Sequence, residues 1–406
     1  MRTLAVLGGA DGAITTLVTA ARLGLHTICI DARTDAPATA YAAEFLNLST
    51  RDVPVVAAAL AARDDLAGVV SPASDVNLPA QYQLSQLLGL PNGLSPQALR
   101  ASVDKGYFRE VCDRLGQPGP RFVQDRPEAV VSGCGNLRYP VIVKPTDSSG
   151  GRGISLCTSP AEVPAAVDAA AAYSAAGIVI VEEFLDGEHY AVEAVVADGE
   201  IVLFGLGART LTEPPHFVTL EHVMPGADAD LVARCRATTE EIVAALGYRW
   251  GSLNADLLVD RDHRVIVIEL GARLGGNGSA ELLGLVHGVD VTAAYVAMAV
   301  GERPDLTPGE PACAAMRVLR AARPGKLVAV RGDDTVRALP GLVDFILAVR
   351  PGDHVEPYHR AGAKLGYLLA TAPDHDQLRA TLAAVDTHLH FDVQPEAAVS
   401  GPDPVA

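Results

Sequence analysis

The stretch from residue 141 to residue 157 constrains the fold more than any other part of the chain. A β-branched run, Val141–Val143, ends in Lys144-Pro145, and a loop rich in serine and glycine leads into a second short apolar run, Ile154–Cys157. Strand, glycine loop and strand predict a hairpin-like flap and not the strand–loop–helix of a Walker P-loop, whose GxxxxGK[ST] spacing is absent. Hairpin loops rich in glycine and serine are also common in ordinary turns, so this segment alone does not show whether it binds a ligand.

The flap carries the groups that hold a phosphate in proteins. Its glycines let backbone N–H groups approach an anion closely, and its hydroxyls and Arg152 can reach phosphate oxygens. Lys144 adds a point charge where the first strand ends. The chain has four lysines among its 32 basic residues, so each lysine is more informative than an arginine. The flap residues that we predict to bind phosphate are Ser148, Ser149, Gly150 and Gly151.

Composition limits the class of protein and its partners. The 406 residues are 49% hydrophobic and 20% charged, which indicates a globular chain with two or three domains. The net charge of −17 argues against nucleic acid or an anionic membrane as a partner, so an anionic ligand needs a local basic cluster. No apolar run approaches a membrane span, and no signal peptide is recognised. The six cysteines form no CxxC pair, which predicts reduced thiols in a cytoplasmic protein.

Residues 1–95 alternate between strand and helix patterns and predict an open parallel α/β domain. Gly8–Gly12 together with Asp31 superficially match a dinucleotide fingerprint, but GGxxG is not GxGxxG, so NAD is a disfavoured ligand. Small ligands bind at the carboxyl ends of parallel strands, which makes Gly9, Ser71 and Asp75 candidate substrate residues. Asp75 fits a helix N-cap equally well.

Two further segments carry candidate residues with plain alternatives. Ser95–Gly116 predicts a linker helix at a domain boundary and carries Lys105, which alone would be a solvated surface lysine. Residues 212–226 have an irregular pattern and contain His222, a candidate for substrate selection or an ordinary loop histidine.

A second hairpin, at residues 252–270, brings two acids together. With a turn at 260–263, Asn254 pairs with Glu269, and Asp256 becomes a diagonal neighbour of Glu269 on the same face. The opposite face would then carry Leu253, Ala255, Leu257, Ile266 and Ile268. Two converging carboxylates repel each other unless a cation lies between them, and oxygen ligands are those that Mg²⁺ prefers. An exposed strand face with unrelated charges is the alternative, and a register shifted by one residue would separate the pair.

Arg273 follows Glu269 by four residues in the glycine-rich segment LGARLGGNGS. Glycines permit close backbone approach there. An arginine beside a metal ion and a phosphate is well placed to stabilise charge on a transferring phosphoryl group or a carboxylate.

Five features in a fixed order resemble the ATP-grasp superfamily, in particular its amino-acid ligases and its biotin-carboxylase-like members. They are the helical Lys105, the strand lysine with its flap at 144–153, the segment EEFL at 182–185, the strand acid Asp256, and Glu-x-x-x-Arg-x-Gly-Gly at 269–276. The resemblance covers most of the chain, and its specificity comes from the ordered set.

The resemblance implies how ATP would bind. Lys105 and Lys144 would contact the α- and β-phosphates under the flap, and Asp256 and Glu269 would bridge Mg²⁺, with Mn²⁺ as a substitute. His189 stands where many members have a ribose-binding glutamate, as in the carboxylase-like members. The adenine would be held by the segment Glu182, Glu183, Phe184 and Leu185.

The resemblance also implies catalytic and substrate residues. Arg273 would act on an acyl-phosphate, and Arg152 of the flap is assigned to catalysis with it. The Glu-x-Asn of many members is Glu269-x-Gly271 here, so one metal ligand is missing or is supplied by Asn254 or Asn277. The predicted substrate residues are Asp75, His222, Arg273, Gly276 and Asn277.

We therefore expect an α/β protein in three parts. These are an N-terminal open parallel α/β domain at 1–95, an α+β ATP-grasp domain at 96–305 with a mobile β-flap lid at about 120–185, and a C-terminal β-rich segment at 306–395. The tail at 396–406 is expected to be disordered.

The expected activity is that of an ATP-dependent carboxylate–amine ligase, which forms an amide through an acyl-phosphate and releases ADP and phosphate. Two alternatives stay open: a carboxylase that uses bicarbonate, of the biotin-carboxylase or purine-biosynthesis type, and a nucleotide-binding regulator without catalysis. The expected partners are small-molecule carboxylate and amine substrates, with a homodimer as the default assembly.

Overall fold

The computed structural model describes residues 1–148, 151–214 and 216–395. The predictions for Ser149, Gly150 and the tail at 396–406 lie outside the described residues.

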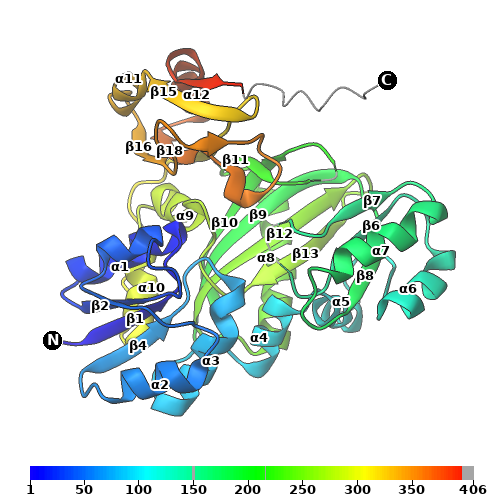
Figure 1. The fold of residues 1–406 in the computed structure, drawn as a ribbon, viewed down its shortest axis with the longest axis horizontal. Coiled ribbons are helices and arrows are strands. Elements are labelled where there is room, and N and C mark those ends of the chain that lie inside the picture. The colour runs from blue at the N-terminus through cyan, green and yellow to red at the C-terminus, as the bar shows by residue number, and fades with distance from the viewer. Residues whose placement is uncertain (149–150, 215, 396–406) are drawn as a thin grey trace, which may run out of the picture.

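The N-terminal domain is a parallel sheet in the order β3-β2-β1-β4 (Figure 1), and the predicted open α/β domain is confirmed. Every residue of β1 is buried, because helices cover both faces of the sheet. Helix α1 packs on one face together with the later helix α10, and α2 and α3 pack on the other. The elements are β1 (Thr3–Leu7), α1 (Ile14–Arg22), β2 (His26–Ile30), β3 (Glu44–Leu46), α2 (Val53–Ala61), β4 (Leu66–Val70) and α3 (Leu78–Leu88).

The linker consists of two helices, α4 (Pro96–Val103) and α5 (Lys105–Arg114), so the prediction of one continuous helix is wrong. Asp104 interrupts it with an extended backbone, and its carboxylate caps α5 by accepting from the backbone N–H of Tyr107 at 3.0 Å. The break places Lys105 in the first turn of α5.

The predicted flap is the β6–β7 hairpin of a small four-stranded sheet, in the order β5-β8-β6-β7. Val141 pairs with Cys157 and Val143 pairs with Ser155. We call this sheet and its helices the lid. Its elements are β5 (Phe122–Asp125), α6 (Pro127–Gly133), β6 (Val141–Pro145), β7 (Ser155–Cys157), α7 (Val163–Ala171) and β8 (Val179–Glu183).

An antiparallel sheet of eight strands forms the centre of the molecule, in the order β13-β12-β9-β10-β11-β14-β18-β16 (Figure 1). Asp198 and Gly199 both have positive φ, as the type I′ turn that an Asp-Gly pair favours requires, and this turn joins β9 to β10. Its elements, with helix α8 against it, are β9 (Gly187–Ala197), β10 (Glu200–Leu211), β11 (Thr219–Met224), α8 (Ala229–Leu246), β12 (Gly251–Asp260), β13 (Val265–Gly271), β14 (Cys313–Leu319), β16 (Leu342–Leu347) and β18 (Gly366–Ala372).

The C-terminal strands therefore extend the central sheet and also build a small sheet of their own, in the order β17-β15-β19. The remaining elements are α9 (Ser279–His287), α10 (Val291–Ala299), β15 (Gly325–Arg331), α11 (Asp333–Arg337), β17 (His354–Val355), α12 (His375–His388) and β19 (His390–Gln394). Short 3₁₀ turns lie at Asp11–Ala13, Pro37–Tyr41, Asp75–Asn77, Cys134–Asn136, Pro160–Glu162 and Ala361–Ala363. Within the described ranges, no single helix is long and apolar enough to cross a membrane, and only the bent pair α9 and α10 would pass by length and composition.

The register predicted for β12 and β13 is wrong by one residue at the turn. Val259 pairs with Val265 and Asn254 with Gly271, because the turn is one residue longer than expected. A bulge at Ile268 then restores the phase, so Asp256 lies directly opposite Glu269. The one-residue shift also moves Ile266 and Ile268 off the face that carries Leu257, contrary to the prediction.

Candidate active site

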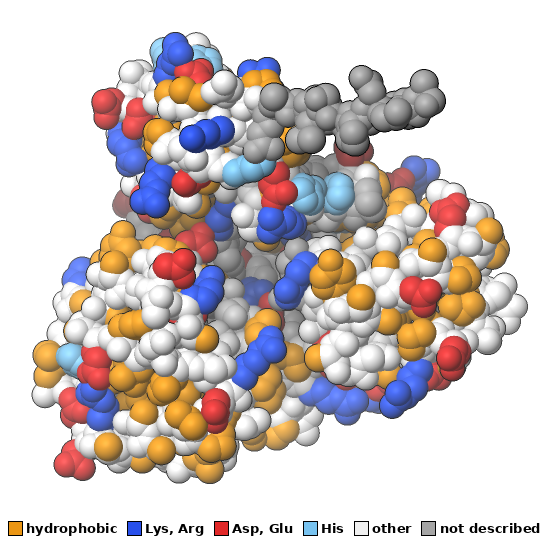
Figure 2. Space-filling model, in the orientation of Figure 1, with side chains coloured by type: hydrophobic (Ala, Val, Ile, Leu, Met, Phe, Trp, Pro, Cys, Tyr) orange, Lys and Arg blue, Asp and Glu red, His pale blue; other side chains and the backbone are white. Residues whose placement is uncertain are grey.

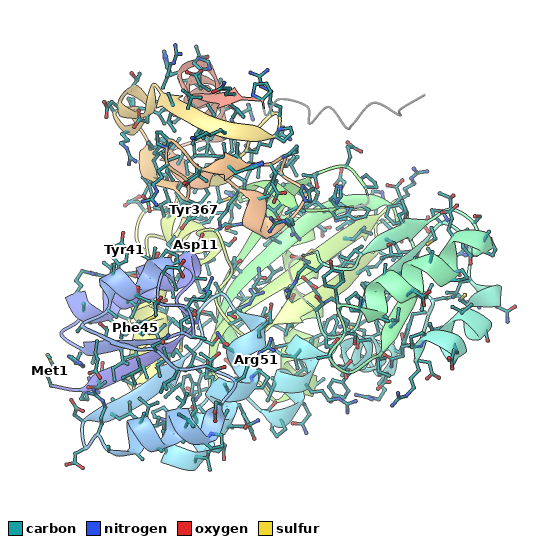
Figure 3. The ribbon with its side chains drawn as sticks, viewed as in Figure 1. Met1, Asp11, Tyr41, Phe45, Arg51 and Tyr367 are labelled. Carbon is teal, nitrogen blue, oxygen red and sulfur yellow. The ribbon has the colours of Figure 1, made fainter. Side chains whose placement is uncertain are left out.

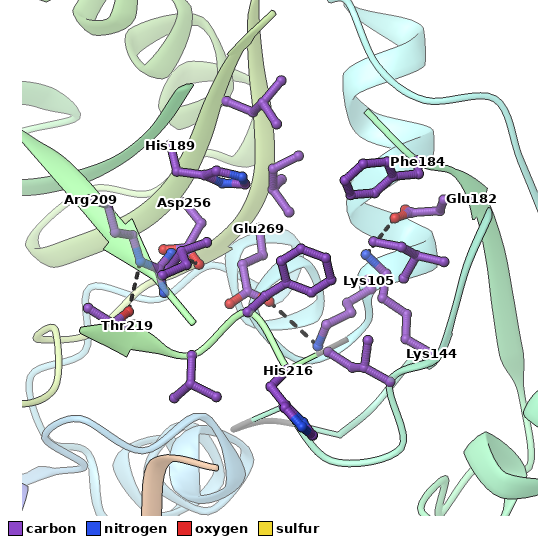
Figure 4. A pocket seen from close by; sticks show the side chains of 18 of the residues that line it. Lys105, Lys144, Glu182, Phe184, His189, Arg209, His216, Thr219, Asp256 and Glu269 are labelled. Atoms are coloured by element: carbon purple, nitrogen blue, oxygen red, sulfur yellow. Dashed lines mark hydrogen bonds and ion pairs between the residues drawn. The ribbon is translucent and has the colours of Figure 1, made fainter. Parts of the chain in front are cut away.

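A cavity of about 270 Å³ lies between the lid and the central sheet (Figure 4). Figure 2 shows a hollow between the lobes of the molecule, with Lys and Arg side chains along it. The lining comes from α5, the flap, β8 with the residues that follow it, the strands β9 to β13, and the turn before β18. It includes the predicted residues Lys105, Lys144, Ser148, Gly151, Arg152, Glu182, Glu183, Phe184, Leu185, His189, Asp256, Glu269 and Asn277.

Lys144 belongs to a buried triad of charged side chains. The Nζ atom of Lys144 lies 2.5 Å from Glu182, and Arg109 of α5 donates to the other oxygen of Glu182 at 3.0 Å. Burial lowers the pKa of Lys144, although Glu182 opposes this, and burial alone would raise the pKa of Glu182, which Lys144 and Arg109 hold below its ordinary value. Arg109 also donates to the backbone oxygens of Val267 and Ile268. Sequence reasoning missed Arg109, since an arginine in a helix reads as surface charge.

Each of the two acids of the hairpin is paired with a positively charged side chain (Figure 4). Asp256 contacts Arg209 of β10, and Glu269 lies 3.7 Å from the Nζ atom of Lys105, which also donates to the backbone oxygen of Ser148 at 2.7 Å. Burial would raise the pKa of Glu269, but the neighbouring lysines hold it below its ordinary value. Arg209 also donates to Thr219 at 2.8 Å and was not predicted.

This donor set fits a divalent cation that shares a phosphate. Asp256 and Glu269 are cross-strand partners, and carboxylate oxygens are ligands that Mg²⁺ prefers. The described part of the chain contains no group of three or more His, Cys, Asp or Glu residues arranged for a metal. Two carboxylates therefore leave most coordination positions to phosphate oxygens and water.

The amide oxygen of each asparagine proposed as a third ligand already accepts a hydrogen bond from a cationic side chain. Asn254 Oδ1 accepts from Arg273 at 3.1 Å, while its Nδ2 donates to Glu193 at 2.7 Å. Asn277 Oδ1 accepts from Lys364 at 2.5 Å. A Cβ at Gly271 would lie 3.0 Å from Asp75 and 3.2 Å from the Arg273 guanidinium carbon, so a larger residue there would have to displace this ion pair slightly.

Arg273 is held by the N-terminal domain. Its guanidinium forms a two-point pair with Asp75, at 2.8 and 3.0 Å. Burial would lower the pKa of Arg273, but Asp75 more than offsets this and the pKa lies above its ordinary value. The carboxylate of Asp75 caps no helix, so the N-cap alternative is wrong.

Glu193 of β9 is a further residue that sequence reasoning missed. It is 2% exposed, and burial raises its pKa to about 8, so it carries a proton at neutral pH. It accepts from Asn254 and from the backbone N–H of Gly275, where a Cβ would lie only 2.0 Å from it. Its signal was present in the sequence: a single acid in the otherwise apolar run AVEAVVA.

The hinge between the lid and the central sheet lies at residues 183–185, and two of its three backbone N–H groups donate hydrogen bonds within the protein. The N–H groups of Glu183 and Phe184 donate to the backbone oxygens of Arg121 and Pro140, both at 2.9 Å, and the Glu183 carboxylate pairs with Arg138. Among the described residues, the N–H of Leu185 has no acceptor, and Leu185 lines the cavity.

Two further polar side chains of the cavity lining, Ser148 and His189, could bind a ligand. The hydroxyl of Ser148 is buried and bonds to no described residue. His189 lines the cavity, and burial together with Arg209 lowers its pKa, which leaves a neutral imidazole suited to hydrogen bonding.

The structure does not bring every predicted residue to the cavity. His222 is buried beneath the loop before α9, 3.4 Å from the hydroxyl of Ser279, and burial lowers its pKa to about 3, so it supports the loop and does not line the cavity. Gly276 lies in this loop with open space beside it. At the other predicted ligand edge, the N–H of Gly9 donates to Asp31 at 2.7 Å, and a Cβ at Gly9 would lie only 2.7 Å from that of Ala36.

Comparison with known proteins gives two family matches. Residues 137–281 match the ATP-grasp domain, and residues 317–394 match the L-amino acid ligase C-terminal domain 2. The protein y4rH of Sinorhizobium fredii is 28% identical over 82% of this chain and 69% of its own length. A biotin carboxylase of Nostoc is 26% identical over 70% of this chain, which spans 65% of that enzyme.

Solved structures agree on the fold. The L-amino acid ligase from Bacillus licheniformis superposes with a TM-score of 0.84 at 19% identity, over 97% of this chain and 99% of that one. Phosphoribosylglycinamide synthetase from Anaerococcus prevotii gives 0.78 at 19% identity, over 97% and 100%. With these matches on the segments that build the cavity, the chain belongs to the ATP-grasp superfamily, whose members are ATP-dependent ligases.

Proposed function

We propose that this protein is an ATP-dependent carboxylate–amine ligase that joins an amino acid or related carboxylate to an amine through an acyl-phosphate. The observation that supports this most directly is a basic cluster around one cavity in a protein of net charge −17. Lys105, Lys144 and Arg209 line it together with the acid pair Asp256 and Glu269.

At the nucleotide end, the residues of the chain divide the work. Lys105 and Lys144 neutralise phosphate charge, the N–H of Leu185 meets the base, and the flap excludes water from the activated carboxylate. Asp256 and Glu269 would hold Mg²⁺, which when bound neutralises charge on the phosphates. Arg209 and Lys105, which pair with these two acids in the structure, would then be available to the phosphates.

At the substrate end, Arg273 lies between the acid pair and the N-terminal domain. Held by Asp75 and Asn254, it presents a fixed positive charge near a carboxylate that accepts a phosphoryl group. Through its backbone N–H groups beyond Gly275, whose own N–H donates to Glu193, the loop at 275–278 can stabilise the oxyanion that forms when the amine attacks.

The proposed organisation follows the same division. Residues 1–95 contribute Asp75, residues 96–305 contribute the nucleotide and metal groups with a lid at about 120–185, and residues 306–395 close the cavity beside Asn277. The C-terminal match to an L-amino acid ligase domain favours an amine acceptor over bicarbonate.

An ADP-release assay tests the function. Purified protein with Mg²⁺ and ATP is incubated with pooled amino acids, with and without bicarbonate, and products are identified by mass spectrometry. We expect ADP release that depends on the amino acids and yields an amide. ADP release that depends on bicarbonate would show that the protein is a carboxylase instead. No ADP release with any pool would refute the proposal that it is a ligase.

A further inference from the structure

Lys364 lies where the N-terminal domain, the central sheet and the C-terminal segment meet. Figure 3 labels Asp11 and Tyr367 close together at this junction, and Lys364 lies between the 3₁₀ turn at Ala361–Ala363 and the start of β18. It is one of four lysines in the chain, and the roles proposed above use only Lys105 and Lys144.

Three contacts hold the ammonium group of Lys364. It lies 2.6 Å from Asp11 of the N-terminal domain and 2.5 Å from Asn277 Oδ1 of the loop before α9. It also lies 5.5 Å from the centre of the Tyr367 ring. The side chain of Lys364 is 13% exposed, so water screens these contacts little.

The contact with Lys364 decides which way the Asn277 amide points. An ammonium group can only donate, so the amide must turn its oxygen toward Lys364. Its NH₂ group then faces away from the lysine, and no described residue accepts a hydrogen bond from it. Asn277 lines the cavity, so this NH₂ group offers two donors to a ligand.

The N-terminal domain thereby holds the loop at 273–277 at two points. Asp75 holds Arg273 at one end, and Asp11 holds Lys364, which holds Asn277 at the other. Asn277 has a left-handed backbone with φ of 56°, a conformation that asparagine tolerates better than most residues.

We propose that Lys364, held by Asp11, is a positioning residue that orients the Asn277 amide so that its NH₂ group binds an oxygen acceptor of the substrate, a carboxylate or carbonyl. This rests on the proposed ligase function, because it assigns the Asn277 end of the cavity to a substrate and not to the nucleotide.

Steady-state kinetics with three variants test the proposal. Wild type is first screened with the twenty amino acids, and the best single amino acid is kept as the probe. Lys364→Met keeps the chain length but removes the charge, and Asn277→Asp keeps an acceptor for Lys364 but removes the NH₂ donors. Lys326→Met, an exposed lysine of β15, is the matched control.

Both test variants should raise the KM for the amino acid about tenfold while changing the KM for ATP less than about twofold, because one oriented hydrogen bond is lost. Lys326→Met should change neither constant. An equal rise in both KM values, or no rise in either, would refute the proposal.

Hydrogen exchange of the backbone amides at 275–279 separates this inference from the proposed function. Lys364→Met and Asp11→Asn should speed this exchange, and Asn277→Asp and Lys326→Met should not. If wild type releases no ADP, the ligase function fails while the exchange still tests the junction. Unchanged exchange in Lys364→Met would refute the positioning role whatever the activity.

Discussion

Glu193 makes stability depend on pH with a sign and size that can be calculated. Its pKa is 4.5 as an ordinary glutamate and about 8 in the folded protein, where burial disfavours the charge. Between these pH values the folded state holds one proton more than the unfolded chain, so the free energy of unfolding falls as pH rises. At about 1.4 kcal/mol per unit, the loss through this window is about 5 kcal/mol.

Glu193→Gln removes the ionisable group and keeps an oxygen that can accept from Asn254 and Gly275. The variant should therefore match wild type near pH 5 and exceed it progressively up to pH 8, by about 5 kcal/mol at most. Urea unfolding followed by the fluorescence of Trp250, the single tryptophan, measures the difference at each pH.

An exposed glutamate provides the control for Glu193. Glu128→Gln, on the surface of α6, should give a difference from wild type that does not change between pH 5 and pH 8.5. A difference for Glu193→Gln that is equally flat would show that Glu193 is ionised in the folded protein, and the reasoning about its burial would be refuted.

Three further substitutions test other groups in the cavity. Lys144→Ala should lower the ADP-release rate at least about 100-fold, because a group that stabilises transition-state charge is removed, and an unchanged circular dichroism spectrum would exclude unfolding as the cause. Arg109→Met removes one of the two cations paired with Glu182 and the donor to the backbone oxygens of Val267 and Ile268, so urea unfolding should show a loss of about 3–5 kcal/mol; a loss below about 1 kcal/mol would contradict the buried triad. Arg209→Met removes the base that pairs with Asp256, so nucleotide-free protein should bind Mn²⁺ several-fold more tightly in a paramagnetic titration, whereas weaker binding would show that Arg209 does not compete with the cation.

Local patterns in the sequence predicted the elements that local physics determines. The flap follows from two β-branched runs around glycines, and the β9–β10 turn follows from Asp198-Gly199, which supply the positive φ values. The break at Asp104 was missed because a capping aspartate inside a good helical pattern looks like one more polar surface residue.

The partners of the site residues could not be predicted in the same way. Arg109 meets Glu182 across 73 positions, and Arg273 meets Asp75 across 198, so nothing in the local sequence marks either pair. The scarcity of lysine drew attention to Lys144 but also made arginines look like generic surface charge. Arg109 shows that this inference overlooked a buried cation.

The bulge at Ile268 explains how one strand serves both the hinge and the acid pair. Without the extra residue, the longer turn at 260–264 would leave Glu269 on the core face, away from Asp256. The bulge corrects the phase and leaves a backbone carbonyl outside the regular ladder, and Arg109 donates to it. The same arginine donates to Glu182, which pairs with Lys144. One buried side chain thus ties the strand of the acid pair to the strand that leads into the hinge, so the positions of the carboxylates and of the phosphate-binding lysine depend on each other.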